Sequence, residues 1–182
     1  FLGKRVYTQN KKINLAPVVF IEASNRLQTL FEEESKGKNH YKMITKRSVK
    51  THNSWTHNTE RMIEGTENTN FLYLNPVDAE QLKLKVGDFA DVTSKHGTLR
   101  IPVQILEELM RGTVAIPHGW GHQHAKGLSV ADKTKGVNVN ILAGSGSEEI
   151  DPLSGMSKLT ALDVKIEPAK DSQAHSWSGL PD

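Results

Sequence analysis

The stretch KVGDFADVTSKHGTLRIPVQIL, residues 85–106, decides the fold of this chain. Apolar and polar residues alternate after Phe89, and they alternate again from Leu99 to Ile105. Alternation with a period of two is typical of β-strands that bury one face. The Lys-His-Gly at 95–97 is typical of a turn, and Asp88 follows a glycine where a side-chain hydrogen bond to the backbone is expected. The stretch therefore predicts two strands joined by a turn.

Short apolar runs on both sides of this pair predict further strands. The expected extended segments are 41–49, 71–75, 113–119, 137–142 and 159–168. Their spacing is too irregular for a meander, and the helices are too few for a doubly wound sheet. We therefore expect a mainly β fold, a small closed β-barrel with one or two short helices and long loops.

Two segments have the pattern of helices. In NPVDAEQLKL (75–84), Asn75 is a candidate N-cap, Pro76 takes the first helical position, and Val77, Ala79 and Leu82 are expected on one side. In ASNRLQTLFEEES (23–35), the apolar residues follow helical spacing from Ala23 onward, with Ser24 or Asn25 as a possible N-cap. We expect residues 1–42 to be a lead-in segment, 43–168 the barrel domain, and 169–182 a loose polar tail.

The composition limits the classes of function. The chain has 182 residues, is 36% hydrophobic and 24% charged, and carries a net charge of +2, which does not indicate a nucleic-acid binder. It has no cysteine, so this chain holds no disulfide, cysteine-ligated zinc or iron–sulfur cluster. No apolar run reaches the roughly 20 residues of a membrane span. We expect a cytoplasmic location and no membrane contact, with any export signal outside this chain.

The stretch AIPHGWGHQH, residues 115–124, raises the question of a site. It places three histidines within seven positions: His118, His122 and His124. The four-residue spacing suits zinc ligands on a helix, but the neighbouring proline and glycines disfavour a helix. Three interpretations stay open: a metal site of a small hydrolase, a turn whose tryptophan packs under the barrel rim, and a loop whose glycine N–H groups approach an anionic ligand.

Two further segments are rich in hydrogen-bonding side chains. THNSWTHN, residues 51–58, is suited either to a polar ligand or to a surface loop built from side-chain-to-backbone turns. Ser54 with His57 is a conceivable hydrolase pair, although no nucleophile-elbow motif surrounds the serine. Asn138 and Asn140 are expected to point the same way on an extended piece, where they would contact a heterocycle or cap loops. Lys46, Arg47 and Lys50 form a basic cluster that is either solvated or near a phosphate.

Taken in order, these segments resemble one family. The strand before NPVDAEQLKL, the Val-Gly-Asp turn, MRGTVAIPHGWGH, VNVN and DPLSG are similar to the C-terminal dinucleotide-binding domain of the molybdopterin oxidoreductases, which include dimethyl sulfoxide reductase and formate dehydrogenases. The upstream KINLAP and THNSWTHN extend the resemblance over roughly residues 11–167. It implies a double-psi β-barrel that closes over a bis(molybdopterin guanine dinucleotide) cofactor carrying molybdenum or tungsten.

The resemblance also implies partners and site residues. The partners are the cofactor and the remainder of a parent oxidoreductase, whose iron–sulfur cluster would lie upstream, and this chain alone would bind without catalysing. We expect a domain excised from a larger enzyme or a separate small subunit of one. The alternative is a double-psi-barrel module that binds proteins or peptides. The candidate cofactor contacts are Arg47, Thr51, His52, Asn53, Ser54, Trp55, His57, Asn58, His118, Gly119, Trp120, Gly121, His122, Asn138 and Asn140.

Overall fold

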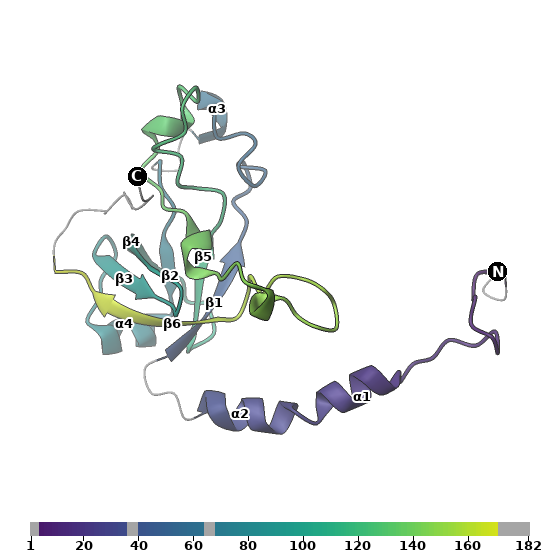
Figure 1. Cartoon of the computed structure of the whole chain (residues 1–182). Helices are drawn as coiled ribbons and strands as arrows, with labels where there is room; N and C mark the ends of the chain where they lie inside the picture. The colour runs from purple at the N-terminus through teal and green to yellow at the C-terminus, as the bar shows by residue number, and fades with distance from the viewer. Residues whose placement is uncertain (1–3, 36–39, 64–67, 171–182) are drawn as a thin grey trace. The chain divides into compact units, whose positions relative to one another are not determined.

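The computed structural model describes residues 4–35, 40–63 and 68–170 of the chain (Figure 1). The described residues divide into two compact units, one with the two N-terminal helices and residues 152–155, and one that begins at β1. None of the helices in this described part combines the length and the apolar character that crossing a lipid bilayer requires.

The first unit contains two short helices where the sequence predicts one. α1 (Val18–Ser24) begins after Pro17, and α2 (Leu27–Ser35) follows two residues later. The Ser24 hydroxyl donates to the Ile21 carbonyl oxygen at 2.7 Å, and the Asn25 N–H donates to the carbonyl oxygen of Glu22. These local bonds close the last turn of α1 and separate the helices. The predicted helix is therefore right for 27–35 and wrong for its start, because Ala23 belongs to α1.

The second unit is a closed six-stranded barrel, as predicted. Its strands are joined in the order β1-β5-β2-β4-β3-β6. Their bounds are β1 (His40–Lys46), β2 (Leu72–Leu74), β3 (Phe89–Thr93), β4 (Thr98–Ile105), β5 (Thr113–Pro117) and β6 (Leu162–Pro168). The pairs β1–β5 and β2–β4 are parallel, and the other pairs are antiparallel. With a few short helices added, the fold is a mixed α/β domain built on a mixed barrel.

The alternating positions of the strands fill the barrel. In β3 and β4 the buried residues are Ala90, Val92, Leu99, Ile101 and Val103, which are the apolar positions of the alternation. They join residues of the other strands in one hydrophobic core. Burying a side chain of this size stabilises the fold by roughly 1.5–3 kcal/mol, so the barrel interior holds the domain together.

The strand directions bring three loops to one end of the barrel. β5 is parallel to β1, while β3 is antiparallel to β6 and β6 is antiparallel to β1. The carboxyl ends of β1, β3 and β5 therefore share an end, which we call the loop end. It carries the segments that follow these strands, 47–59, 94–97 and 118–138, and Figure 1 shows α3 (Glu60–Ile63) there, away from α4.

α4 (Pro76–Leu82) has the cap that the sequence predicts. The Asn75 side chain accepts from the Val77 N–H at 2.9 Å, and Pro76 occupies the first turn. The buried face differs from the prediction: Ala79 is buried as expected, but Val77 is 40% exposed. Asp78 is buried in its place because its carboxylate accepts from the Gly112 N–H at 2.7 Å.

Two further local predictions have opposite outcomes. The expected role of Asp88 is confirmed, because its carboxylate accepts from the Lys85 N–H at 2.8 Å and closes the turn around Gly87, whose φ is +88°. The extended piece expected at 137–142 is wrong: residues Val139–Leu142 form the 3-10 helix η3. The Asn138 side chain starts η3 by accepting from the Asn140 N–H at 3.1 Å.

Candidate functional site

The loops after β1 and β5 leave the barrel side by side. The last paired residues of these parallel strands are Lys46 and Pro117, and the His118 N–H donates to the Lys46 carbonyl oxygen at 3.1 Å. The segments 51–58 and 118–122, which are distant in the sequence, therefore start from neighbouring points.

Gly119 packs directly on the backbone of the first loop. A Cβ atom at this position would lie 2.6 Å from the Asn53 carbonyl carbon and closer still to its oxygen. Gly119 has a φ of +92°, and Asn53 also lies in the left-handed region with a φ of +62°. Only glycine fits a position that combines this φ with such a close approach. The Gly-Trp-Gly segment is thereby fixed against 51–58.

Gly121 makes the same kind of contact with the third segment. Its φ is +97°, and a Cβ atom there would lie 2.6 Å from the Cβ of Asn138. The structure thus brings together all three segments that the sequence singled out, with Gly-Trp-Gly between the other two.

The two tryptophans of these segments occupy opposite environments. Trp120 is 3% exposed, and its ring covers Gly136, where an added Cβ would lie 2.6 Å from the ring atom Cε3. Trp55 is 84% exposed. Trp120 is therefore packed inside the loop end, whereas the ring of Trp55 lies on its surface.

His57 is buried against the loop after β5. It is 1% exposed, and its ring meets Trp120 edge-on with centroids 4.5 Å apart and His122 edge-on at 5.1 Å. Neither ring nitrogen of His57, nor Nε1 of Trp120, has a hydrogen-bond partner among the described residues. Burial lowers the pKa of His57 to about 4, with a smaller contribution from the neighbouring His122. His57 is consequently neutral at pH 7, and its ring makes no hydrogen bond with the Ser54 hydroxyl, so the conceivable hydrolase pair does not form.

The remaining candidates of 51–58 shape the loop. The segment is a succession of turns in which the N–H groups of Trp55 and His57 donate to carbonyl oxygens three residues earlier. Thr51 is buried, and His52 has a φ of +42° at the surface. The exposed Asn58 accepts at Oδ1 from the N–H groups at 130 and 131, at 3.0 and 3.2 Å. Arg47 is exposed.

The histidines of the second loop do not assemble into a metal site. His118 is half-buried, and Nε2 of the half-buried His122 lies 2.8 Å from the Gly119 carbonyl oxygen, while His124 is exposed. Across 4–35, 40–63 and 68–170, no group of three His, Asp or Glu side chains is arranged to hold a metal ion.

A pocket of about 290 Å³ lies beside these loops, between them and the β3–β4 pair. Gly121, His124, Gly136 and Asn138 line one side, and Arg100 lines another. Arg100 was not among the residues predicted from the sequence. It forms a two-pronged ion pair with Asp91, with N–O distances of 2.6 and 2.8 Å. Apolar side chains, among them Leu99 and Ile141, line much of this pocket beside a few polar groups, which suits a heterocyclic ligand.

Asn70 is a second residue that the sequence analysis missed. It is 1% exposed, and its side-chain nitrogen donates to the carbonyl oxygens of Pro117 and Val137 at 2.9 and 3.0 Å. Its side-chain oxygen accepts from the Val137 N–H at 2.9 Å. Asn70 thus fastens the end of β5 to the segment that carries Gly136 and Asn138.

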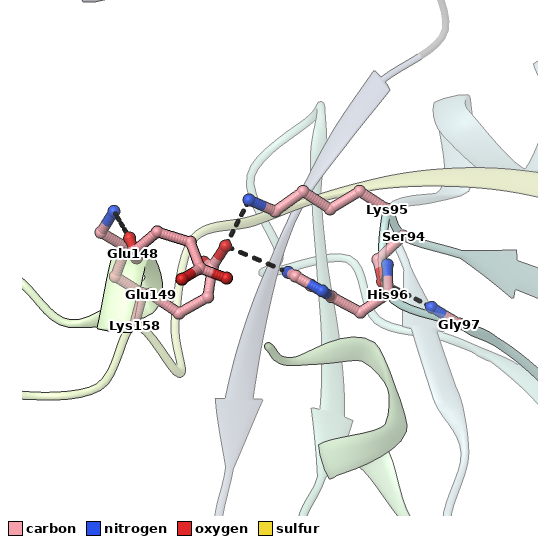
Figure 2. Close-up of polar contacts among 7 residues, drawn as sticks. All are labelled: Ser94, Lys95, His96, Gly97, Glu148, Glu149 and Lys158. Carbon is pink, nitrogen blue, oxygen red and sulfur yellow. Dashed lines mark hydrogen bonds and ion pairs between the residues drawn. The ribbon is translucent and has the colours of Figure 1, made fainter. Parts of the chain in front are cut away.

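A buried carboxylate fixes the turn between β3 and β4. Glu149, in the 3-10 helix η4 (Ser147–Glu149), accepts from Lys95 and lies 3.3 Å from Nε2 of His96 (Figure 2). The Lys95 hydrogen bond lowers the pKa of Glu149 against the opposing effect of burial. The close-up also shows Ser94 accepting from the N–H groups of His96 and Gly97 within the turn. The contacts of Glu149 with Lys95 and His96 therefore attach the segment around residue 149 to the turn at 94–97, which lies at the loop end.

Comparison with known proteins decides the family. The model of the molybdopterin dinucleotide binding domain matches residues 41–162. This chain belongs to that family. The matched range contains the three candidate segments, β2 to β5 and all of β1 but its first residue, so the match covers most of the barrel and its loop end.

Individual relatives agree with this family. The chain is 33% identical over 88 residues to the arsenate respiratory reductase molybdopterin-containing subunit ArrA of Chrysiogenes arsenatis, which covers 48% of this chain and 10% of that protein. It is 32% identical over 107 residues to the menaquinone reductase molybdopterin-binding-like subunit of Nitratidesulfovibrio vulgaris, covering 59% and 14%. The chain therefore spans only a small part of the length of these relatives.

A solved structure has the same fold. Acetylene hydratase from Pelobacter acetylenicus superposes with a TM-score of 0.64 at 19% identity. The match covers 89% of this chain and 24% of that one. The barrel is thus a fold that also occurs inside a much longer chain.

Proposed function

We propose that this chain is the domain of a molybdenum- or tungsten-dependent oxidoreductase that closes over a bis(molybdopterin guanine dinucleotide) cofactor, and that its barrel has the double-psi arrangement. The family match supports the class of ligand. Formate dehydrogenases are one branch of parent enzymes that the sequence resembles. In the parent, the bound cofactor supplies the redox chemistry, and this domain supplies binding and orientation.

The residues at the loop end fit such a ligand. Its diphosphates need N–H donors, and Gly119 and Gly121 fix the backbone of the second loop with positive φ against Asn53 and Asn138. Its heterocycles need hydrogen-bonding edges, which His118, Ser54 and Asn140 offer from surface or half-buried positions. We propose that the exposed and half-buried candidates of the three segments act alongside them, and that Arg47 lies near a phosphate. The buried Thr51, His57 and Trp120 would support these loops from within.

One observation carries this proposal: three segments with glycine contacts and polar side chains converge at the loop end. Gly119 lies on Asn53, and Gly121 lies on Asn138. A protein- or peptide-binding module has no need of a glycine-lined, histidine-rich loop end, and it would instead call for an exposed apolar groove.

The proposal predicts that His118→Ala in the full-length protein weakens cofactor retention about tenfold, because losing one hydrogen bond to a charged group costs roughly 1.5–3 kcal/mol. The measurement is molybdenum, tungsten and guanosine monophosphate released from the purified protein. His40→Ala is the matched control, since His40 begins β1 at the opposite end of the barrel. Equal cofactor content in both variants would contradict the assignment of this loop.

A further inference from the structure

The contact between His57 and the second loop is unusual because no hydrogen bond directs it. The ring is 1% exposed and is held edge-on by Trp120 and His122, with both nitrogens lacking partners in the described part of the chain. A buried polar ring without hydrogen bonds lowers stability. Its position must therefore be maintained by packing between the two loops.

We propose that His57 is a positioning residue, whose neutral buried ring holds the loop after β1 against the loop after β5 and releases it when the ring is protonated. This packing contact of the His57 ring lies next to the contact between Gly119 and Asn53. Its consequence for cofactor binding rests on the proposed function, but the loop contact itself does not.

The charges around the ring set the direction of the pH effect. Of the two rings packed against His57, Trp120 is uncharged and His122 becomes a like charge when protonated. Burial and His122 lower the pKa of His57 from 6.5 to about 4. Below about pH 6.5, His57 binds a proton when the loops are open but not when they are closed, so opening becomes more favourable as the pH falls. Above that pH the neutral ring holds the two loops together fully.

The size of the effect follows from the same values. Between pH 7 and pH 5 the opening equilibrium of the two loops should rise about 20-fold. The strands of the barrel should not show this rise, because protonation of His57 acts on the loop contact alone.

Hydrogen–deuterium exchange of the full-length protein tests the proposal. Exchange is compared at pH 7 and pH 5, after correction for the intrinsic pH dependence, in peptides covering 47–59, 118–125 and β4. We expect both loops to open together about 20-fold more at pH 5 in the wild type. In His57→Phe, which keeps an aromatic ring of similar size but cannot be protonated, the rise should disappear, and His40→Phe should behave as the wild type.

Two results would contradict this role of His57: the same rise in loop opening in His57→Phe as in the wild type, or a rise in the opening of only one of the loops. If the phenylalanine variant misfolds, His57→Gln gives the same test, because glutamine does not titrate either. The readout does not involve the cofactor. If the exchange experiment contradicts the role of His57, the proposed cofactor-binding function is not affected. If the protein does not bind the cofactor, the exchange experiment still tests the role of His57.

Discussion

Gly119→Ala is expected to destabilise the 182-residue chain by about 2–5 kcal/mol. A left-handed φ costs a non-glycine residue roughly 1–2 kcal/mol, and forcing extra atoms into a packed site costs roughly 1–3 kcal/mol more. The φ at Gly119 is +92°, and the added methyl would meet the Asn53 backbone, which cannot move as a flexible side chain would. Urea unfolding at neutral pH measures the loss.

Gly127→Ala is the matched control for this prediction. Gly127 has a φ of +84°, but a Cβ atom there would meet nothing within 4 Å. It should cost only the conformational part, about 1–2 kcal/mol. If the two variants lose equal stability, the close approach of Gly119 to Asn53 is not a constraint, and the glycines say nothing about a site.

Asn70→Ala is expected to cost about 3–4 kcal/mol in the same assay. The substitution removes three hydrogen bonds and leaves the Val137 N–H and the Pro117 carbonyl buried. Each buried group left without a partner costs roughly 1–3 kcal/mol. The loss should also loosen the segment that carries Asn138, since Asn70 is its connection to the end of β5.

Asn140→Ala serves as the comparison, because the Asn140 side chain is exposed. Surface substitutions of this kind change stability by roughly 0.5 kcal/mol or less. Similar losses for Asn70 and Asn140 would show that the buried asparagine does not hold the loop end together.

The elements fixed by local pattern were predictable from the sequence. Alternation predicted β3 and β4, and Asn75 with Pro76 predicted the start of α4. In both cases the physical cause lies within a few residues of the chain. The glycines of Gly-Trp-Gly were interpreted as positions of approach to a ligand, whereas the close approach in the structure is to Asn53 and Asn138 of the same chain.

Other features depend on contacts that a single sequence does not reveal. Asn70 bonds residues 47 and 67 positions away, so nothing in its own neighbourhood marks it. The ion pair of Arg100 could have been predicted from the sequence. If the two strands are paired residue by residue on either side of the turn at 94–97, Arg100 lies opposite Asp91. The 3-10 helix at 139–142 was missed because Asn138 and Asn140 were expected on an extended piece. Of the two uses considered for Asn138, the structure shows the cap, which starts this helix.

The central claim is that three loops at one end of the barrel form a single cofactor-binding surface. Hydrogen–deuterium exchange of the full-length protein at neutral pH, compared with and without its cofactor, tests it most directly. We expect the cofactor to protect peptides covering 51–58, 118–124 and 136–140 together, and to leave exchange in α4, at the other end, unchanged. Protection confined to one of these segments, or found at α4 instead, would contradict it.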